Sequence, residues 1–458
     1  MVALVFVAGT RPEMIKIFPI MTANTLKKYY HIFIWSGQHY DYELSRVFFE
    51  EFGGLDPDYD LGVGSGSHGI QTAKLVQGVE EVLRKVGDKG IVVAVGDTNT
   101  VLGAGLASVK MGWIFAHVES GLRSFDRYMP EEINRIVADH IANILFAPST
   151  QAVLNLLYEG VDPWRIYLTG NTVVDAVKMI TPRVMKERDR VIAELGIEEP
   201  YALVTLHRAE NVDHADRLAR ILKGLREVSE EIRLIFPMHP RTRRRIEELG
   251  LSSLLEGIRI IRPLGYVEFL ALLSKAEVVF TDSGGVQEEA FTLSVPCVTL
   301  RRNTERPETV WLGGNILVGD DPEKIVAIYR YVANYRDEIV KKIGSVENPY
   351  GDGRAGERIA DVLKRIIEDE GLFERLSYGK ENEPDYRDTD YPIHVIVSGS
   401  IFEGMKIEDV HQQYQGIYIT LIYDEKGRPM IPHNDRVIKK DWKVRVWGPR
   451  KIIASLIR

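Results

Sequence analysis

The chain has 458 residues, of which 45% are hydrophobic and 27% are charged, and its formal net charge is −8. This length is too great for one compact core and predicts two or three domains. The composition is typical of a globular protein and argues against extensive disorder. The negative charge argues against a nucleic-acid partner, so any anionic ligand must meet a local group of positive charges.

A single cysteine, Cys297, excludes a disulfide framework and a cysteine-based metal site. The histidines show no zinc-binding spacing, so we expect neither a metal ion nor another cofactor. The apolar segment of residues 1–8 lacks the basic region of a signal peptide and is too short to span a bilayer. We therefore expect a cytoplasmic protein without a membrane partner, in which these residues form a buried strand.

In the N-terminal part of the chain, short β-branched runs alternate with helical patterns. The runs are expected to form strands at residues 2–7, 32–35, 91–95, 114–117 and 144–146. Such alternation is typical of a parallel sheet that is covered by helices on both faces. It predicts a first doubly wound, Rossmann-like domain over residues 1–170.

A second series of strands is expected at residues 201–206, 233–236, 259–261, 278–281 and 296–300. It predicts a second Rossmann-like domain over residues 171–370, which ends in a helical stretch near 358–370. Ligands of such sheets bind beyond the carboxyl ends of the strands. The turns after the strands of both domains are therefore expected to face a shared crevice.

Residues 371–391 are rich in Asp, Glu, Tyr and Gly and lack apolar periodicity, which indicates a linker. Beyond it, strand-like runs at 393–397, 418–423 and 443–447 precede a short helix and predict a small module over residues 392–458. The predicted fold class is α/β, with two doubly wound domains and a small C-terminal α+β domain.

A candidate phosphate site follows the strand that ends at Thr281 in the second domain. Ser283, Gly284 and Gly285 lead into a helix there, and bare N–H groups at such a helix start can bind an anion. Glu289, further along this helix, could reach sugar hydroxyls. A capped helix with a glycine turn explains the same pattern equally well.

Three arginines follow the next strand at the same edge of the sheet: Arg301, Arg302 and Arg306. Guanidinium groups suit phosphate oxygens and could supply the local positive charge. Basic residues in loops are more often solvated, so only the shared edge favours a binding role.

Carboxylates stand at the ends of neighbouring strands in the first domain. Asp97 follows one strand and Glu119 follows the next, and crowded carboxylates suit acid–base chemistry. Glu131 and Arg135 lie one helical turn apart and could instead form an ordinary salt bridge. His207, at the end of the first strand of the second domain, could titrate or only donate a hydrogen bond.

Residues 64–69 satisfy the G-x-G-x-x-G pattern of dinucleotide sites. No convincing buried strand leads into this segment, because the polar residues 56–60 precede it. We interpret residues 64–69 as a flexible loop that moves over the crevice, and we reject nicotinamide-dinucleotide binding.

Seven motifs occur in order along residues 1–370. They are residues 9–13 with Lys16, 96–98, 117–123, 130–135, 205–211, 282–289 and 304–308. Together they resemble the non-hydrolysing UDP-N-acetylglucosamine 2-epimerases. The resemblance implies the two-domain GT-B fold, in which the last helix of the second domain crosses back to the first. It also implies a cofactor-free isomerase that interconverts UDP-N-acetylglucosamine (UDP-GlcNAc) and UDP-N-acetylmannosamine (UDP-ManNAc).

The resemblance also implies roles for single residues. The acid–base carboxylates would be Asp97, Glu119 and Glu131, with Arg135 and His207 as further catalytic positions. The nucleotide and diphosphate contacts would be Arg11, Lys16, Phe269, Ser283, Gly284, Gly285, Glu289 and Arg306. Leu264 stands where some members have a glutamine. In bacterial members a second UDP-GlcNAc is an allosteric activator, and the corresponding segments here contain Gln38, His39, Gln71 and His239.

In the tail, Gly404 and Met405 precede a short helix, Gly416 precedes a strand, and residues 431–435 and 441–449 complete a pattern. This pattern resembles the C-terminal ligand-binding domain of RCK and TrkA-type potassium-channel regulators. The resemblance implies a module that pairs with a second copy, giving a homodimer, or that binds a small-molecule regulator. A passive tail is the alternative.

The implied reaction explains the residue types in the first domain. Departure of UDP from C1 makes the C2 proton acidic, so that its removal gives 2-acetamidoglucal, and UDP then adds back with a proton on the opposite face. This sequence needs acid–base groups on two faces and cations for the diphosphate. The alternatives are a GT-B glycosyltransferase that uses a UDP-sugar, a hydrolysing epimerase that releases ManNAc, and a UDP-sugar sensor without catalysis.

Overall fold

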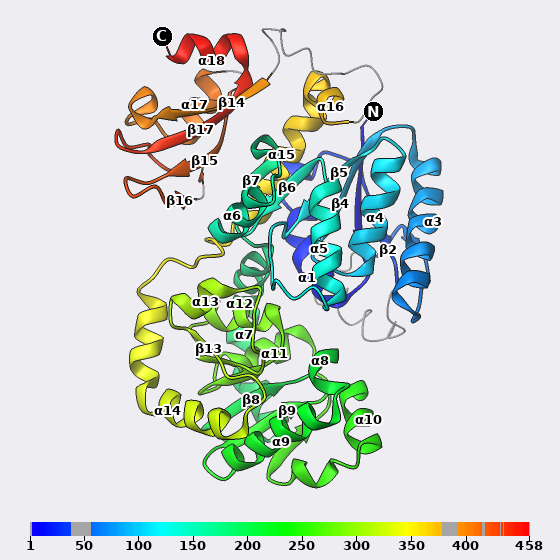
Figure 1. Cartoon of the computed structure of the whole chain (residues 1–458), viewed down its shortest axis with the longest axis vertical. Coiled ribbons are helices and arrows are strands. Elements are labelled where there is room, and N and C mark those ends of the chain that lie inside the picture. The colour runs from blue at the N-terminus through cyan, green and yellow to red at the C-terminus, as the bar shows by residue number, and fades with distance from the viewer. Residues whose placement is uncertain are drawn as a thin grey trace. The chain divides into compact units, whose positions relative to one another are not determined.

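The computed structural model describes residues 2–37, 56–377, 392–414, 417–430, 432–433 and 435–457 (Figure 1). They form two compact units. The first contains the N-terminal residues, Asp56–Thr172 and Gly353–Arg458, and the second contains Val173–Asp352. Each unit is built on its own parallel sheet, which confirms the predicted α/β class. Among the described helices, none is both long and apolar enough to cross a lipid bilayer.

The sheet of the first unit has the strand order β3-β2-β1-β4-β5-β6-β7, and all its pairings are parallel. The strands are β1 (Ala3–Ala8), β2 (His31–Trp35), β3 (Tyr59–Asp60), β4 (Gly90–Val95), β5 (Ile114–Val118), β6 (Ile144–Ala147) and β7 (Ile166–Leu168). Strands β4, β5 and β6 are buried along their whole length because helices cover both faces. The five expected strands are confirmed. The two that sequence patterns missed, β3 and β7, are the short strands at the two edges.

The strand that precedes residues 64–69 is β3, which has only two residues and is not buried. This agrees with the expectation that no buried strand leads into the segment. The next helix, α3, begins at His68, inside the G-x-G-x-x-G pattern. A two-residue edge strand cannot build the buried βα turn of a dinucleotide site.

The helices of the first unit include α15, which crosses back to the N-terminal domain as expected. It packs on α1 so closely that a Cβ atom at Gly356 would lie 2.7 Å from the Pro19 carbonyl oxygen. The helices before the C-terminal module are α1 (Arg11–Met21), η1 (Asn24–Leu26), α3 (His68–Val86), α4 (Asn99–Lys110), α5 (Pro130–Ile141), α6 (Thr150–Tyr158), η2 (Pro163–Arg165), α15 (Ala355–Glu368) and α16 (Glu370–Leu376).

Helix α16 corrects the predicted start of the linker. Residues 370–376, expected to begin an irregular segment, form a helix whose Leu372, Phe373 and Leu376 are buried. The side-chain amide of Asn143 donates to the Leu376 carbonyl and holds the end of this helix on the first domain. The pattern is too short to show helical periodicity, so only packing reveals it.

The sheet of the second unit has the order β10-β9-β8-β11-β12-β13 and is also fully parallel. Its strands are β8 (Tyr201–Thr205), β9 (Arg233–Pro237), β10 (Ile258–Ile261), β11 (Val279–Thr281), β12 (Cys297–Thr299) and β13 (Asn315–Leu317). Its helices are α7 (Thr172–Glu194), α8 (Ala209–Val212), α9 (Ala215–Ser229), α10 (Pro240–Glu248), η3 (Ser252–Leu255), α11 (Tyr266–Leu273), α12 (Gly284–Thr292), α13 (Pro307–Trp311) and α14 (Pro322–Gly344). The edge strand β13 was not predicted.

In both sheets the strand order reverses next to the first strand, between β1 and β4 and between β8 and β11. Open α/β sheets bind ligands beyond the carboxyl ends of the strands at such switch points. Each unit therefore has one predicted binding edge. The turns after β1 and β4 form it in the first unit, and those after β8 and β11 form it in the second.

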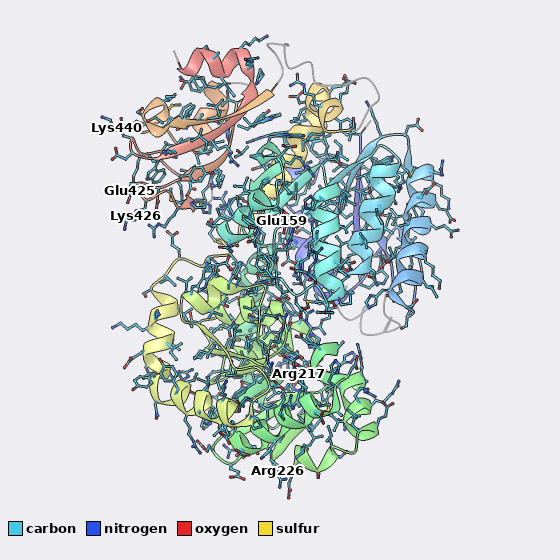
Figure 2. All side chains as sticks on the ribbon, in the orientation of Figure 1. Glu159, Arg217, Arg226, Glu425, Lys426 and Lys440 are labelled. Atoms are coloured by element: carbon cyan, nitrogen blue, oxygen red, sulfur yellow. The ribbon has the colours of Figure 1, made fainter. Side chains whose placement is uncertain are left out.

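The C-terminal module is an antiparallel sheet of order β14-β17-β15-β16 with a core of its own, which confirms the predicted α+β domain. Its elements are β14 (Pro392–Ser398), η4 (Gly399–Phe402), α17 (Ile407–Gln413), β15 (Tyr418–Tyr423), β16 (Pro429–Met430), β17 (Lys443–Pro449) and α18 (Arg450–Ile457). The turn with Glu425 and Lys426, labelled in Figure 2, joins β15 to β16.

The module is part of the first unit rather than a free appendage. The side chains of Leu421 and Tyr423 on β15 pack into the hydrophobic core of the N-terminal domain, and β15 contacts β7. The Thr150 hydroxyl donates to the Pro429 carbonyl over 2.8 Å. Burial of these side chains on the N-terminal domain stabilises the docked module.

Candidate active site

The turn after β1 is organised by Glu13, which is buried in the first turn of α1. One carboxylate oxygen accepts the backbone N–H groups of Gly9 (2.7 Å) and Thr10 (2.9 Å), and the other accepts the Thr98 hydroxyl. Burial raises the pKa of Glu13 to about 7, although these hydrogen bonds lower it. Glu13 thus ties the turn after β1 to the turn after β4, a role that its place in a motif did not reveal.

Glu119 follows the last residue of β5 and is the most constrained of the predicted carboxylates. Its φ is +67°, and among the described residues only three non-glycine residues have a positive φ. Its Oε2 lies 2.6 Å from Lys16 Nζ, and its Oε1 accepts from Asn171 Nδ2 over 2.6 Å. The side chain is 3% exposed. A strained backbone persists only where its surroundings fix it, and such residues cluster at functional sites.

Asp97 follows β4 and contacts Arg135 on α5. Arg135 Nε donates to Asp97 Oδ2 over 3.0 Å, and Nη1 lies 2.6 Å from Glu132 Oε2. The amide of Asn134 donates to the Asp97 carbonyl over 2.9 Å. The side chain of Asp97 is 29% exposed whereas that of Arg135 is 3% exposed. A buried guanidinium therefore orients a carboxylate that remains accessible.

The structure brings Asp97 and Glu119 to one edge, as the strand order predicts. Gly96, directly before Asp97, donates its backbone N–H to the Val118 carbonyl over 3.0 Å. A Cβ atom at Gly96 would lie 3.6 Å from Glu119 Oε2, and φ at Gly96 is +94°. The turns after β4 and β5 are therefore in direct contact, and Lys16 adds a cation from α1.

Glu131 and Glu132 are neighbours in the first turn of α5 with different environments. Glu131 is half-buried, whereas Glu132 is buried and accepts the backbone N–H groups of Ser124 (3.0 Å) and Phe125 (2.8 Å). Glu132 also pairs with Arg135 at a spacing of three residues. Glu132 thus holds the loop between Glu119 and α5, which sequence reasoning missed because its partners are backbone groups.

Behind the turn after β5 lies a buried group of charges. His117 Nδ1 is 2.6 Å from Asp139 Oδ1, and Arg123 Nη1 is 2.7 Å from Asp139 Oδ2. Arg123 also pairs with Glu159, labelled in Figure 2, over 2.7 Å. Burial opposes ionisation of Asp139, but His117 and Arg123 hold its pKa below the usual range. This group supports the backbone that carries Glu119.

In the second unit, Asp282 joins the turns after β8 and β11. It is fully buried and accepts the backbone N–H groups of His207 (3.1 Å) and Arg208 (2.9 Å) and the Asn211 amide (3.2 Å). The His207 side chain is about half exposed, with Nδ1 3.4 Å from Asp282 Oδ1. Desolvation lowers the pKa of His207 and nearby guanidinium groups add to this effect, whereas Asp282 opposes it.

The turn predicted to bind phosphate leads into α12. The helix begins at Gly284 with Ser283 as its N-cap, and no atom of the described residues lies within 4 Å of a Cβ atom built on Gly285. A Cβ atom at Gly284 would lie 3.8 Å from Arg306 Cζ, and Arg306 Nε is 2.9 Å from Glu288 Oε2. The same Cβ atom would lie 3.6 Å from Glu305 Oε2, so the guanidinium and the helix start share this place with a carboxylate. The N–H groups and the guanidinium could still bind an anion together.

The other two arginines of this edge have partners within the fold. Arg301 is fully buried and pairs with Glu305 over 2.8 Å and with Glu210 over 2.7 Å. Arg302 pairs with Asp320 over 3.0 Å. Arg306 is likewise paired with a carboxylate, that of Glu288. It is favoured for an anion only because its guanidinium lies next to Gly284 at the start of α12.

The remaining predicted residues divide between the two units. Arg11 and Lys16 lie on α1 in the first unit, where Lys16 contacts Glu119. Phe269 on α11, the buried Leu264 and the buried Glu289 on α12 belong to the second unit. The shared crevice of the two units stays a prediction.

Two of the four predicted allosteric residues are described. Gln71 is buried, donates to the Gly64 carbonyl over 2.9 Å and accepts from Asn99, so it anchors the glycine-rich segment. His239 is the N-cap of α10. Gln38 and His39 lie outside the described residues, as do Gly416 and residue 431 of the tail pattern.

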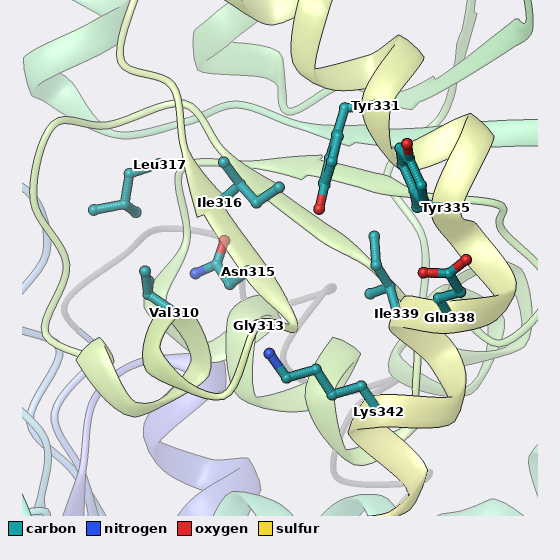
Figure 3. Close-up of a pocket in the computed structure, with 10 residues that line it drawn as sticks. All are labelled: Val310, Gly313, Asn315, Ile316, Leu317, Tyr331, Tyr335, Glu338, Ile339 and Lys342. Carbon is teal, nitrogen blue, oxygen red and sulfur yellow. The ribbon is translucent and has the colours of Figure 1, made fainter.

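A cavity of about 500 Å³ lies elsewhere in the second unit, between β13 and α14 (Figure 3). Tyr331 and Tyr335 stand side by side on its wall, with ring centroids 5.0 Å apart, and Lys342 lines it further along α14. The residues that line it lie on and around the edge strand β13, away from the switch point between β8 and β11. It is separate from the predicted phosphate cradle.

Comparison with known proteins agrees with this geometry. The sequence profile of a family described as UDP-N-acetylglucosamine 2-epimerase matches residues 23–364. The UDP-N-acetylglucosamine 2-epimerase of Methanococcus maripaludis is 44% identical over 365 residues, which are 78% of this chain and 97% of the relative. The UDP-2,3-diacetamido-2,3-dideoxy-D-glucuronate 2-epimerase of Pseudomonas aeruginosa is 38% identical over 367 residues, 79% of this chain and 99% of the relative.

A solved structure has the same architecture. The crystal structure of Methanocaldococcus jannaschii UDP-GlcNAc 2-epimerase in complex with UDP-GlcNAc and UDP is 46% identical, with a TM-score of 0.73, over 79% of this chain and 99% of that chain. The profile covers most of both Rossmann-like domains, and the identities far exceed what a shared fold alone requires. The chain belongs to the UDP-N-acetylglucosamine 2-epimerase family.

Proposed function

We propose that this protein interconverts UDP-GlcNAc and UDP-ManNAc by elimination of UDP and its re-addition. The observation that carries the proposal is the strained Glu119, whose carboxylate is held by Lys16 and Asn171 beside the Asp97–Arg135 pair. A glycosyltransferase needs a donor site and an acceptor, but not several oriented carboxylates at one strand edge. Acid–base groups held in fixed positions suit proton removal from C2 and proton delivery to the other face.

In this mechanism the C1–O bond breaks first and leaves oxocarbenium character at C1. A carboxylate among Asp97, Glu119 and Glu131 then removes the C2 proton, which gives 2-acetamidoglucal and UDP. Re-addition of UDP, with a proton delivered to the opposite face of C2, inverts that centre. Arg135 orients Asp97 through the 3.0 Å hydrogen bond, and Lys16 orients Glu119.

The second unit supplies most of the nucleotide contacts in this proposal, and Arg11 and Lys16 on α1 supply the others. The N–H groups of Ser283, Gly284 and Gly285 and the guanidinium of Arg306 bind the diphosphate, on which negative charge grows as C1–O breaks. Phe269 packs on the uracil side and Glu289 binds the ribose hydroxyls. His207 is half-exposed at the end of β8, where a neutral imidazole can donate a hydrogen bond to the departing UDP.

UDP-GlcNAc is the substrate that the relatives favour. The relatives at 44% and 46% identity carry that substrate in their names, whereas the relative named for a diacetamido-glucuronate is 38% identical. Both substrates share the UDP group and the 2-acetamido centre, so the same inversion applies to each. A direct comparison of kcat/KM for the two sugars tests this preference.

Proton NMR of UDP-GlcNAc with the enzyme in D2O tests the proposal. We expect UDP-ManNAc that carries deuterium at C2, with no free ManNAc and no requirement for an acceptor. Free ManNAc would instead identify a hydrolysing epimerase, and turnover only with an acceptor would identify a glycosyltransferase. UDP-ManNAc without C2 exchange would overturn the elimination mechanism.

We further propose that the C-terminal module dimerises the enzyme or, alternatively, binds a small-molecule regulator. Its four-stranded antiparallel sheet with two helices supports the resemblance to the RCK C-terminal domain. Light scattering of the full chain and of a chain cut after Ser377 tests the first part. We expect the full chain to be a dimer and the truncated chain to be a monomer. If both chains are dimers, pairing through the module is refuted.

A further inference from the structure

Asn171 is a buried residue in the loop between β7 and α7, and no sequence motif drew attention to it. Its side chain is directed at Glu119, with Nδ2 donating to Oε1 over 2.6 Å. Lys16 holds the other oxygen over 2.6 Å. An ammonium group on one oxygen stabilises the charge of a carboxylate but leaves the rotation of the carboxylate plane free. When an amide also binds the second oxygen, the positions of both oxygens are fixed.

The loop that carries Asn171 is held from outside by α15. Arg358 on this helix donates from Nη1 to the Thr169 carbonyl over 2.9 Å, two residues before Asn171. Thr169 donates its N–H to the Ala147 carbonyl over 3.0 Å, which continues the pairing of β6 and β7. Between Thr169 and Asn171, Gly170 has a φ of +88°, so the chain turns sharply at this point. Arg358 therefore sets where the turn begins.

The C-terminal module contacts this same arginine. The Nη2 atom of Arg358 is hydrogen-bonded to His433 Nδ1, which lies in the segment after β16. Two turns further along α15, Arg365 contacts His411 Nδ1 over 3.2 Å and stacks on the Tyr418 ring, 5.1 Å from its centroid. The module thus contacts two arginines on one face of α15, and one of them leads to Asn171.

We propose that Asn171 is a positioning residue for the Glu119 carboxylate and that the C-terminal module sets its position through Arg358. The path is continuous: His433 contacts Arg358, Arg358 holds Thr169, and Asn171 in the same loop holds Glu119. This inference rests on the proposed function of Glu119. Reactive groups displaced by as little as about 1 Å can lose roughly 100-fold in rate, so a small movement of this loop changes turnover.

The role of Asn171 is tested with Asn171→Ala and Asn171→Asp. We expect Asn171→Ala to lower kcat for C2 inversion by about tenfold or more while KM changes less than twofold. In Asn171→Asp a second carboxylate faces Glu119, which disfavours ionisation of Glu119. The limb of the pH–rate profile that reports the deprotonated base therefore moves to higher pH. A structural role alone would not move that limb.

The role of the module is tested with His433→Ala in the full chain. We expect kcat to fall several-fold, and we expect no further fall when the substitution is added to Asn171→Ala, because both act on one path. Thr150→Ala is the matched control, since it removes a contact between the module and the N-terminal domain that lies outside the path. Its kcat should stay within twofold of that of the unaltered protein.

Unchanged kcat and an unchanged pH profile in both Asn171 variants would overturn the positioning role. Independent, multiplicative effects of His433→Ala and Asn171→Ala would overturn the path from the module. If Asn171→Ala does not fold, Asn171→Ser, which keeps a small polar side chain, replaces it in both measurements. Failure of the proposed function is distinguishable, because the unaltered protein would then show no C2 exchange at all.

Discussion

At the scale of single residues, two buried carboxylates of the first unit are held in different ways. Glu13 accepts backbone N–H groups and a hydroxyl, whereas Glu119 accepts an ammonium group and an amide. Neutral donors compensate a buried negative charge less than a cation does. Burial accordingly raises the pKa of Glu13 to about 7.

The raised pKa of Glu13 makes the free energy of unfolding of the protein depend on pH. Its pKa is about 7 in the folded protein against an ordinary value of 4.5, so the folded state binds the extra proton between these values. Stability from this group is therefore greatest below pH 4.5 and falls by about 1.4 kcal/mol per pH unit up to pH 7. Glu13→Gln cannot lose a proton, so relative to the unaltered protein it should gain about 3 kcal/mol over this range.

Thermal midpoints of Glu13→Gln and of the unaltered protein at pH 5 and pH 8 measure this effect. The difference between the two proteins should grow in favour of the variant at pH 8. Glu80→Gln, on the exposed face of α3, is the control and should show no such change. Parallel midpoints at both pH values would contradict a raised pKa of Glu13.

Glu119 should be required for turnover but not for nucleotide binding. We expect Glu119→Gln to lower kcat by roughly 100-fold to 10,000-fold, the range for loss of a general acid or base. Its affinity for UDP, measured by calorimetry, should change little because the proposed cradle is in the second unit. A loss of UDP affinity with retained turnover would contradict this assignment.

At the scale of elements, packing decided the features that sequence patterns missed. Strands β3, β7 and β13 have two or three residues each and lie at the edges of their sheets, where each pairs with a single neighbour. Segments this short give little periodicity of their own. Helix α16 was taken for linker because its apolar residues become buried only against the N-terminal domain. The long strands β1, β4 and β8 were predicted because burial on both faces leaves continuous apolar runs.

The contact between α15 and the module should weaken in acid. Burial and the guanidinium of Arg365 lower the pKa of His411 from 6.5 to about 3, and Tyr418 is the other polar ring beside it. The folded state therefore resists protonation of His411. The stability of this contact is complete above pH 6.5 and falls by about 1.4 kcal/mol per pH unit as the pH drops towards 3.

Hydrogen exchange of α17 and β15 at pH 7 and pH 5 measures this effect, after correction for the intrinsic rate. Protection should fall at pH 5 in the unaltered protein. In His411→Gln, which keeps an acceptor for the Ile419 N–H but does not titrate in this range, the loss should be much smaller. Equal losses in both proteins would show that His411 is not the group responsible.

At the scale of the whole molecule, the C-terminal module is joined to the N-terminal domain by apolar and polar contacts. Leu421 and Tyr423 contribute to the first-domain core, and His433 and His411 contact α15. Removal of the module after Ser377 uncovers this apolar surface. The truncated protein should still catalyse C2 exchange, but with a lower thermal midpoint and increased binding of a hydrophobic dye. An unchanged midpoint would show that the docked module contributes nothing to stability.

The candidate site was partly predictable. Asp97, Glu119 and the Ser283-Gly284-Gly285 turn could be located because they directly follow predicted strands, and parallel strands place their carboxyl ends at one edge. Three other residues could not be located: Asn171, Glu132 and Arg358. The partner of Asn171 is 52 residues away, Glu132 binds backbone N–H groups, and Arg358 binds a carbonyl group 189 residues away. Single polar or charged residues of this kind carry no local pattern that distinguishes a site residue from a surface one.

The sequence by itself determined the two doubly wound domains, the module and the family, because alternating apolar runs and ordered motifs are local properties of the chain. Only the tertiary structure decided which groups hold each carboxylate in place. The left-handed backbone of Glu119, its ammonium partner 103 residues earlier and its amide partner 52 residues later exist only when distant segments pack together. The reason is physical: periodicity encodes which face of an element is buried, but the partner of a buried charge depends on which segments meet there.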